Sequence, residues 1–98
     1  MTQVSKHFMS PVIEEKVYKV FIESVKNTRS ADEVIDFLSD LLTSTEKIMR
    51  SKRVSVAFLL IQGQHDYRQI SKILRVSLGT IARIHAVLAL QGKGFRKI

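Results

Sequence analysis

The sequence predicts an all-α fold of five helices, and three observations carry this prediction. Apolar residues recur at the i, i+3, i+4 spacing of amphipathic helices through most of the chain, whereas no stretch shows the alternation typical of a strand. Three segments have the spacing of a capping box, in which Ser, Thr or Asp precedes Glu or Gln by three residues. Each box falls where the apolar periodicity restarts, so the helix starts and the helix faces agree.

The first two helices are expected in the N-terminal half, after a flexible arm at 1–9. Ser10 can cap a helix with Pro11 at its first position, where the N–H that proline lacks would have no helical partner anyway. The apolar stripe of this helix consists of Ile13, Val17, Val20, Phe21 and Val25. Ser30 and Glu33 form the first capping box and open a second helix. The inward side chains of that helix are expected to be Val34, Phe37, Leu38, Leu41 and Leu42.

The third helix is expected to be the longest. Thr43 and Glu46 form the second capping box, and the apolar positions continue to Gln62. Gly63 suits the left-handed residue that often ends a helix. The apolar residues of this helix are Ile48, Met49, Val56, Leu59, Leu60 and Ile61.

The third box, Asp66 and Gln69, opens two helices that have the pattern of a helix-turn-helix. Residues 74–77 leave room only for a tight turn, and Ser77 can cap the last helix, which is expected over 78–91. Two short helices that cross steeply would present the second one as a reader of the DNA major groove. The alternative is an ordinary helical hairpin whose apolar spacing serves only a core.

The chain is expected to fold as one domain, because it is short and contains no linker or low-complexity segment. Its expected parts are the arm at 1–9, dimerisation and core helices at 10–62, the helix-turn-helix at 66–91 and a basic tail at 92–98. The helices carry more apolar surface than one small monomer readily covers. This favours a homodimer over a compact monomer with ordinary exposed apolar residues.

The two halves of the chain differ in charge. Residues 1–46 contain five Lys or Arg and eight Asp or Glu, whereas residues 47–98 contain eleven Lys or Arg and a single acid, Asp66. The basic half is the half that carries the helix-turn-helix pattern. A cation-rich surface attracts DNA because it releases counterions condensed on the phosphate backbone. Double-stranded DNA is therefore the favoured partner, over an acidic protein or membrane surface.

Several function classes are disfavoured. The chain has no Cys, which excludes a disulfide framework, a thiolate zinc site and a cysteine nucleophile. The three histidines, His7, His65 and His85, do not have metal-ligand spacing, and no Gly-rich phosphate loop follows a strand. We therefore expect no enzyme, no metal and no cofactor. Since no long apolar run occurs, we expect no membrane partner and a cytoplasmic protein.

The DNA-contacting residues are expected on the outer face of the last helix and in the turn before it. Small side chains there would let the helix enter the groove, and Arg83 alone could make a bidentate contact to guanine. Arg75 occupies the turn position that most often holds glycine, and a left-handed backbone at this arginine would cost roughly 1–2 kcal/mol. The predicted contact residues are Lys72, Arg75, Ser77, Leu78, Gly79, Thr80, Ala82 and Arg83. Further candidates for phosphate contact are Lys47, Arg50, Lys52 and Arg53.

The run from 41 to 91 resembles the Trp repressor family without a gap. The residues that carry the resemblance are Leu41, Leu42, Thr43, Glu46, Arg53, Leu59, Leu60, Gly63, Arg68, Ile70, Leu74, Thr80, Ile81 and Arg83. The resemblance implies an intertwined helical dimer that binds operator DNA and represses transcription. It also implies that Arg68, at a family position near the start of the first motif helix, reaches the groove.

The chain departs from the tryptophan-sensing member of this family at the ligand site. Thr43, Arg53 and Arg83 match three of its ligand-binding positions and form a candidate effector pocket. Ile84, however, stands where that member has the glycine against which the indole slides, and Val87 stands where it has a serine. We therefore expect no binding of tryptophan, and the sequence does not identify another effector.

These observations favour a sequence-specific DNA-binding transcriptional regulator of repressor type. Phosphate contacts and DNA shape are expected to contribute more than base contacts, because few side chains on the outer face can recognise bases. The alternative is a non-regulatory helix-turn-helix module, which would serve protein interaction or DNA recognition within a larger assembly.

Overall fold

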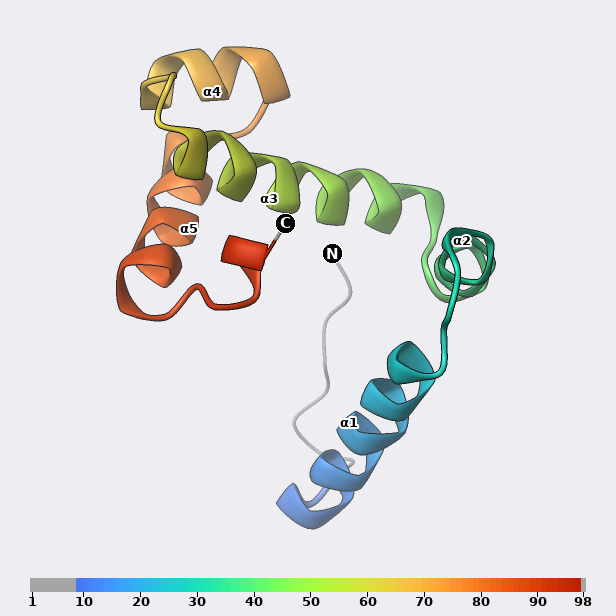
Figure 1. Ribbon diagram of the computed structural model, residues 1–98. Helices are drawn as coiled ribbons and strands as arrows, with labels where there is room; N and C mark the ends of the chain where they lie inside the picture. The colour runs from blue at the N-terminus through green and yellow to red at the C-terminus, as the bar shows by residue number, and fades with distance from the viewer. Residues whose placement is uncertain (1–8, 98) are drawn as a thin grey trace. The chain divides into compact units, whose positions relative to one another are not determined.

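The computed structural model describes residues 9–97 and contains five α-helices and one short 3-10 helix (Figure 1). The elements are α1 (Pro11–Lys26), α2 (Ala31–Leu41), α3 (Ser44–Gln62), α4 (Tyr67–Leu74), α5 (Leu78–Leu90) and η1 (Phe95–Lys97). The described residues form no strand, so the predicted all-α fold is confirmed. The predicted arm at 1–9, apart from Met9, lies outside the described residues.

Contacts divide the chain into two compact units, Met1–Thr43 and Ser44–Ile98. All the buried apolar side chains of the described residues lie in the second unit, and neither α1 nor α2 buries a residue. The single domain expected from the length of the chain stays a prediction.

The caps of α1 and α2 follow the sequence. The Ser10 hydroxyl accepts a hydrogen bond from the Ile13 amide at 3.3 Å, and Pro11 begins α1 as expected. The Ser30 hydroxyl accepts from the Glu33 amide at 3.2 Å. The reciprocal bond differs from the expected box, because the Glu33 carboxylate accepts from the amide of Arg29 rather than from that of Ser30.

The core of the second unit lies where α3, α4 and α5 meet. Val56 and Ala57 of α3 face Ile70 of α4, and all three are inaccessible to solvent. From α5, Ile81, Ile84 and Leu88 complete the cluster. The partly buried side chains around it are Leu59, Leu60, Tyr67, Leu74, Val76 and Phe95. The i, i+3, i+7 spacing of the α5 residues therefore fixes which side of this helix faces inward and which remains free.

The basic tail is more ordered than the sequence suggested. Gly92 has a φ of 66°, and a Cβ there would lie 2.9 Å from the Leu88 Cα, so only glycine allows the chain to turn back at this point. Phe95 in η1 then packs against the core. The Arg96 guanidinium donates to the Leu88 carbonyl at 2.8 Å and so satisfies a carbonyl at the end of α5.

None of the helices in the described part of the chain has, by itself, the length and apolar character to span a membrane. Taken together, α4 and α5 have that length and apolar character, but the chain bends by 116° between them.

Candidate nucleic-acid interface

The direction of the chain turns by 116° between α4 and α5, within three residues, Arg75 to Ser77. This angle lies within the range of about 90–120° that is typical of helix-turn-helix motifs. The fold holds it because Ile70 of α4 and Ile81 and Ile84 of α5 are fully buried in the same cluster.

Arg75 has the left-handed conformation expected from its place in the turn. Its φ is 56° and its ψ is 51°, and it is the only non-glycine residue with positive φ in the described part of the chain. Its amide donates to the Ser71 carbonyl, while the Lys52 ammonium of α3 donates to the Arg75 carbonyl at 3.2 Å. A non-glycine residue in this conformation costs roughly 1–2 kcal/mol, which these contacts help to offset.

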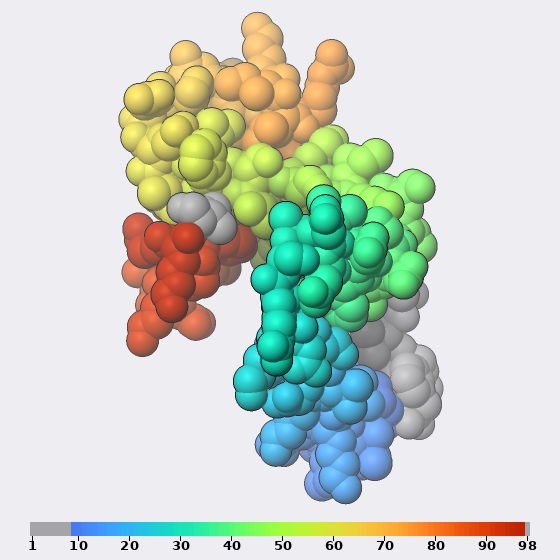
Figure 2. Space-filling view, turned by 45° about the vertical axis from the view of Figure 1, so that its right-hand side comes forward, coloured from blue at the N-terminus to red at the C-terminus, as the bar shows by residue number. Residues whose placement is uncertain are grey.

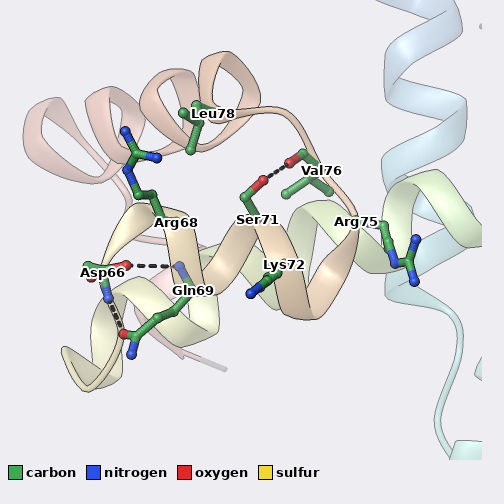
Figure 3. A pocket seen from close by; sticks show the side chains of 8 residues that line it. All are labelled: Asp66, Arg68, Gln69, Ser71, Lys72, Arg75, Val76 and Leu78. Carbon is green, nitrogen blue, oxygen red and sulfur yellow. Dashed lines mark hydrogen bonds between the residues drawn. The ribbon is translucent and has the colours of Figure 1, made fainter.

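Ser71 closes the turn with both its side chain and its backbone. Its hydroxyl donates to the Val76 carbonyl at 2.6 Å, and the Val76 amide donates to the Ser71 carbonyl at 3.3 Å (Figure 3). In the sequence, Ser71 is a small residue where two helices would cross. Its hydrogen-bonding role was missed, because a serine inside a helix gives no sign of which distant carbonyl its hydroxyl will meet.

Replacing Ser71 with alanine is expected to lower the free energy of unfolding by about 1–2 kcal/mol, since the partly buried Val76 carbonyl would lose its partner. Urea denaturation followed by circular dichroism measures this change. Ser51→Ala is the matched control, because Ser51 is exposed on α3 and its replacement should change stability by less than about 0.5 kcal/mol. Equal stabilities of the two variants would contradict the assigned role of Ser71.

The start of α5 is organised by three polar side chains in series. The Ser77 hydroxyl accepts from the Thr80 amide at 3.1 Å, as its N-cap role predicts, and lies 2.9 Å from the Thr80 hydroxyl. The Arg83 guanidinium donates to that Thr80 hydroxyl at 3.3 Å. Arg83 therefore reaches back toward the N-terminal end of α5, and its guanidinium would lie 3.7 Å from a Cβ at Gly79.

Arg68 and Lys72 are four residues apart on α4, Arg75 directly follows the end of this helix, and all three are exposed. These residues, Arg68, Lys72 and Arg75, line an open groove together with Leu78 at the start of α5 (Figure 3). Among the described residues, Asp66 is the only one with a carboxylate that lines this groove. In Figure 2, extended side chains project from the part of the molecule coloured gold to orange, which includes α4 and the start of α5.

Asp66 is engaged at the N-terminus of α4. Its carboxylate accepts from the Gln69 amide at 2.8 Å, and the Gln69 side chain accepts from the Asp66 amide at 2.9 Å (Figure 3). The predicted third capping box is therefore present in full. The one acid of the groove thus caps a helix, while the surrounding side chains give the surface a positive charge.

The remaining predicted contact residues lie at the surface of the same unit. Gly79, Ala82 and Arg83 are exposed on α5, and Thr80 is half-buried. Among the further phosphate candidates, Lys47, Arg50 and Arg53 are exposed on α3. Lys52 differs from them, because it is half-buried and its ammonium is bound to the Arg75 carbonyl.

The candidate effector residues do not share one unit. Thr43 ends the first unit, whereas Arg53 and Arg83 belong to α3 and α5 of the second. Ile84 is fully buried in the core, which agrees with a packing role for this side chain, and Val87 is 36% exposed.

Tyr67 and His85 form a contact that the sequence did not suggest. The Tyr67 hydroxyl is hydrogen-bonded to the His85 Nδ1, and the two rings meet edge to face with their centroids 5.7 Å apart. The pair joins α4 to α5 beside the apolar core, against which Tyr67 packs. His85 thus has a structural partner, and the described residues contain no group of three or more His, Cys, Asp or Glu that could hold a metal ion.

Comparison with known proteins gives a family for the chain. No curated protein and no solved structure is significantly similar to it. The model of the family described as Trp repressor protein, however, matches residues 16–98 and so covers most of the chain. This match extends the resemblance beyond 41–91 to include most of α1, all of α2 and the C-terminal segment. The chain therefore belongs to the Trp repressor family.

Proposed function

We propose that the protein is a sequence-specific, DNA-binding transcriptional regulator of repressor type, which inserts the N-terminal part of α5 into the major groove. Its family consists of DNA-binding regulators. The observation that carries the proposal is the geometry of α4 and α5, two helices at 116° with a cationic groove along α4. In DNA-binding helix-turn-helix motifs, the recognition helix is likewise held by its buried apolar side while its other side remains free to contact DNA.

The residues around the motif would have different tasks. Lys72 and the backbone amides at the start of α5 would bind phosphates, because cations and helix N-termini both favour anions. Gly79 and Ala82 would let α5 approach the base edges closely. Arg83 would supply the direct base contact, and its bond to Thr80 positions the guanidinium near the end of α5 that enters the groove. Arg68 would contact DNA from the start of α4.

We further propose that the protein acts as a homodimer. The first unit buries none of its described residues, although α1 carries a full apolar stripe and its Phe21 is 42% exposed. On α3, Val54, Phe58 and Ile61 form another exposed stripe at i, i+4, i+7 spacing. Exposed apolar patches of this extent mark interaction sites, and a second copy of the chain would offer the same stripes in return. A dimer would also match palindromic DNA with two recognition helices.

Light scattering coupled to size-exclusion chromatography tests this proposal. The protein alone should elute with the mass of two chains, and with a duplex long enough for two half-sites it should elute as one dimer per duplex. The experiment also tests the alternative, a protein-interaction module, which would bind the duplex at most weakly and lose it as the salt concentration rises. No bound duplex at low salt would contradict DNA binding by this domain.

Arg83 and Lys72 are expected to affect DNA binding in different ways. Arg83→Ala should cost about 1–3 kcal/mol of discrimination at one base position, because the variant cannot bind guanine in bidentate fashion. Lys72→Ala should weaken binding to all sequences equally and lower the dependence of log K on log salt by about 0.9 for each phosphate that Lys72 binds. Binding titrations on a preferred and a scrambled duplex, each at several salt concentrations, measure both effects. The assignment fails if Arg83→Ala keeps the sequence preference while Lys72→Ala abolishes it.

No cofactor is proposed. Ile84 fills the position where the tryptophan-sensing member has a glycine, and its side chain is packed in the core. The regulator would therefore bind DNA without tryptophan, in the cytoplasm, and any effector would be a different molecule.

A further inference from the structure

We propose that Arg75 is a dedicated phosphate-binding residue, which the left-handed turn holds at the end of the α4 groove, and that Lys52 positions it. This inference rests on the proposed DNA binding. It assigns a role to a feature that folding alone does not require, namely an arginine where the backbone favours glycine.

The residues at the other positions with positive φ support this role of Arg75. The chain has three described residues with positive φ, and two of them, Gly63 and Gly92, are glycines. These glycines follow α3 and α5, and neither of them lines the groove. At the third position, between α4 and α5, the chain instead carries a long cationic side chain in a conformation that glycine would adopt without strain. Strain that the surrounding structure maintains is often associated with function.

The place of Arg75 provides an independent observation. Arg75 follows the C-terminal end of α4, and it lines the same open groove as Arg68 and Lys72 (Figure 3). One turn of helix advances by about 5.4 Å, so Arg68 and Lys72 lie about one turn apart, and Arg75 lies beyond the end of the helix. A row of this kind can follow a chain of phosphates. Since Asp66 is engaged in its capping box, it does not provide a partner for Arg75 at the far end of α4.

Lys52 explains how the turn is maintained. Its ammonium donates to the Arg75 carbonyl, which lies at the C-terminal, negative end of α4. The bond ties the backbone of Arg75 to α3 while the Arg75 side chain remains exposed. Lys52 is therefore a positioning residue, since its charge is used inside the protein and not on DNA.

Three variants test whether Arg75 binds phosphate and Lys52 positions it, or whether Arg75 is only a solvated surface residue. Arg75→Gly removes the cation and the strain together, so its melting temperature should rise by roughly 3–6 °C while DNA affinity falls. The slope of log K against log salt concentration should become shallower by about 0.9 for each Arg75 side chain that binds a phosphate in the complex. Arg75→Lys keeps the charge and should retain the slope of the original protein. Lys52→Met keeps the apolar stem and should lower the melting temperature and the affinity, but in the Arg75→Gly background it should leave the slope unchanged, because its effect on DNA binding passes through Arg75.

Fluorescence-anisotropy titrations with a labelled duplex, at several salt concentrations, give the affinity and the slope, and thermal denaturation gives the stability. Opposite changes in stability and affinity for Arg75→Gly, with a shallower slope, would support the proposal. Unchanged affinity and slope for Arg75→Gly, beside normal binding by the original protein, would overturn it and leave the proposed function intact. A shallower slope when Lys52→Met is added to Arg75→Gly would overturn the positioning role, because Lys52 would then bind phosphate itself. Failure of the original protein to bind any duplex would instead overturn the proposed function itself.

Discussion

Replacing Phe21 with aspartate is expected to convert the protein from dimer to monomer and to lower its DNA affinity by at least about 100-fold, which corresponds to about 3 kcal/mol of binding free energy. Phe21 lies in the middle of the α1 stripe and is 42% exposed, on a helix that buries no residue of its own. In the proposed dimer it would be covered by the second chain. A carboxylate there would have to be buried without a partner, which costs several kcal/mol.

Lys19→Asp is the control for this experiment. Lys19 lies on the same helix as Phe21 but on the opposite side, where its side chain is 73% exposed. The new carboxylate should remain in water, so the dimer and its DNA binding should persist. Sedimentation velocity measures the state of both variants. A dimeric Phe21→Asp protein with normal DNA affinity would show that the α1 stripe is not part of the interface.

Replacing Ile84 with glycine is expected to destabilise the protein by about 3–6 kcal/mol, combining the removal of a buried isoleucine side chain with the cost of glycine inside a helix. Ile84 is inaccessible to solvent and contacts the cluster that holds α5 against α3 and α4. Although the substitution restores the glycine of the tryptophan-sensing member, it should remove the packing that orients α5. We expect thermal denaturation to show non-cooperative unfolding or a large fall in the melting temperature.

Val87→Ser tests the second departure from the tryptophan-sensing member with little risk to the fold. Val87 is 36% exposed, so the change should cost less than about 1 kcal/mol. Isothermal titration with L-tryptophan should give no heat of binding for the original protein or for Val87→Ser. Saturable binding by the original protein would contradict this expectation, because it would require space that Ile84 occupies.

Local sequence rules predicted the helix boundaries well. Ser10, Ser30, Asp66 and Ser77 all cap the helices that they were expected to cap. These interactions involve residues three apart, so their geometry is determined once a helix begins. The buried positions of α4 and α5 were also predictable, since the apolar period alone identifies the inward face.

Contacts between distant parts of the chain were not predictable in the same way. Lys52 donates to a carbonyl 23 residues away, and Arg96 folds back on Leu88 from a tail that the sequence indicated only as basic. The bond between Tyr67 and His85 likewise depends on how α4 crosses α5. Periodicity places a residue on a face of its own helix, whereas these contacts depend on the packing of one helix against another.

In the candidate site, too, local features were predictable and contacts between helices were not. Its cations were predicted as surface residues from the apolar period and the charge of the C-terminal half, and Arg68, Lys72, Arg75 and Arg83 are all exposed. The sequence did not show that the first three line one groove, or that Arg83 bends back toward Thr80. Base preference is less predictable still, since it depends on side-chain positions within the complex and on DNA shape.

Selection of binding sites from a random pool of duplex DNA, at near-physiological salt, decides whether the protein recognises a DNA sequence as a dimer. We expect recovery of a palindrome whose half-sites are about one helical turn apart, as two recognition helices related by a two-fold axis require. Recovery of sequences no different from the starting pool, with weak binding that disappears as salt rises, would contradict the proposed function. That result would leave a basic helical domain without sequence-specific recognition of DNA, and it would favour the protein-interaction module.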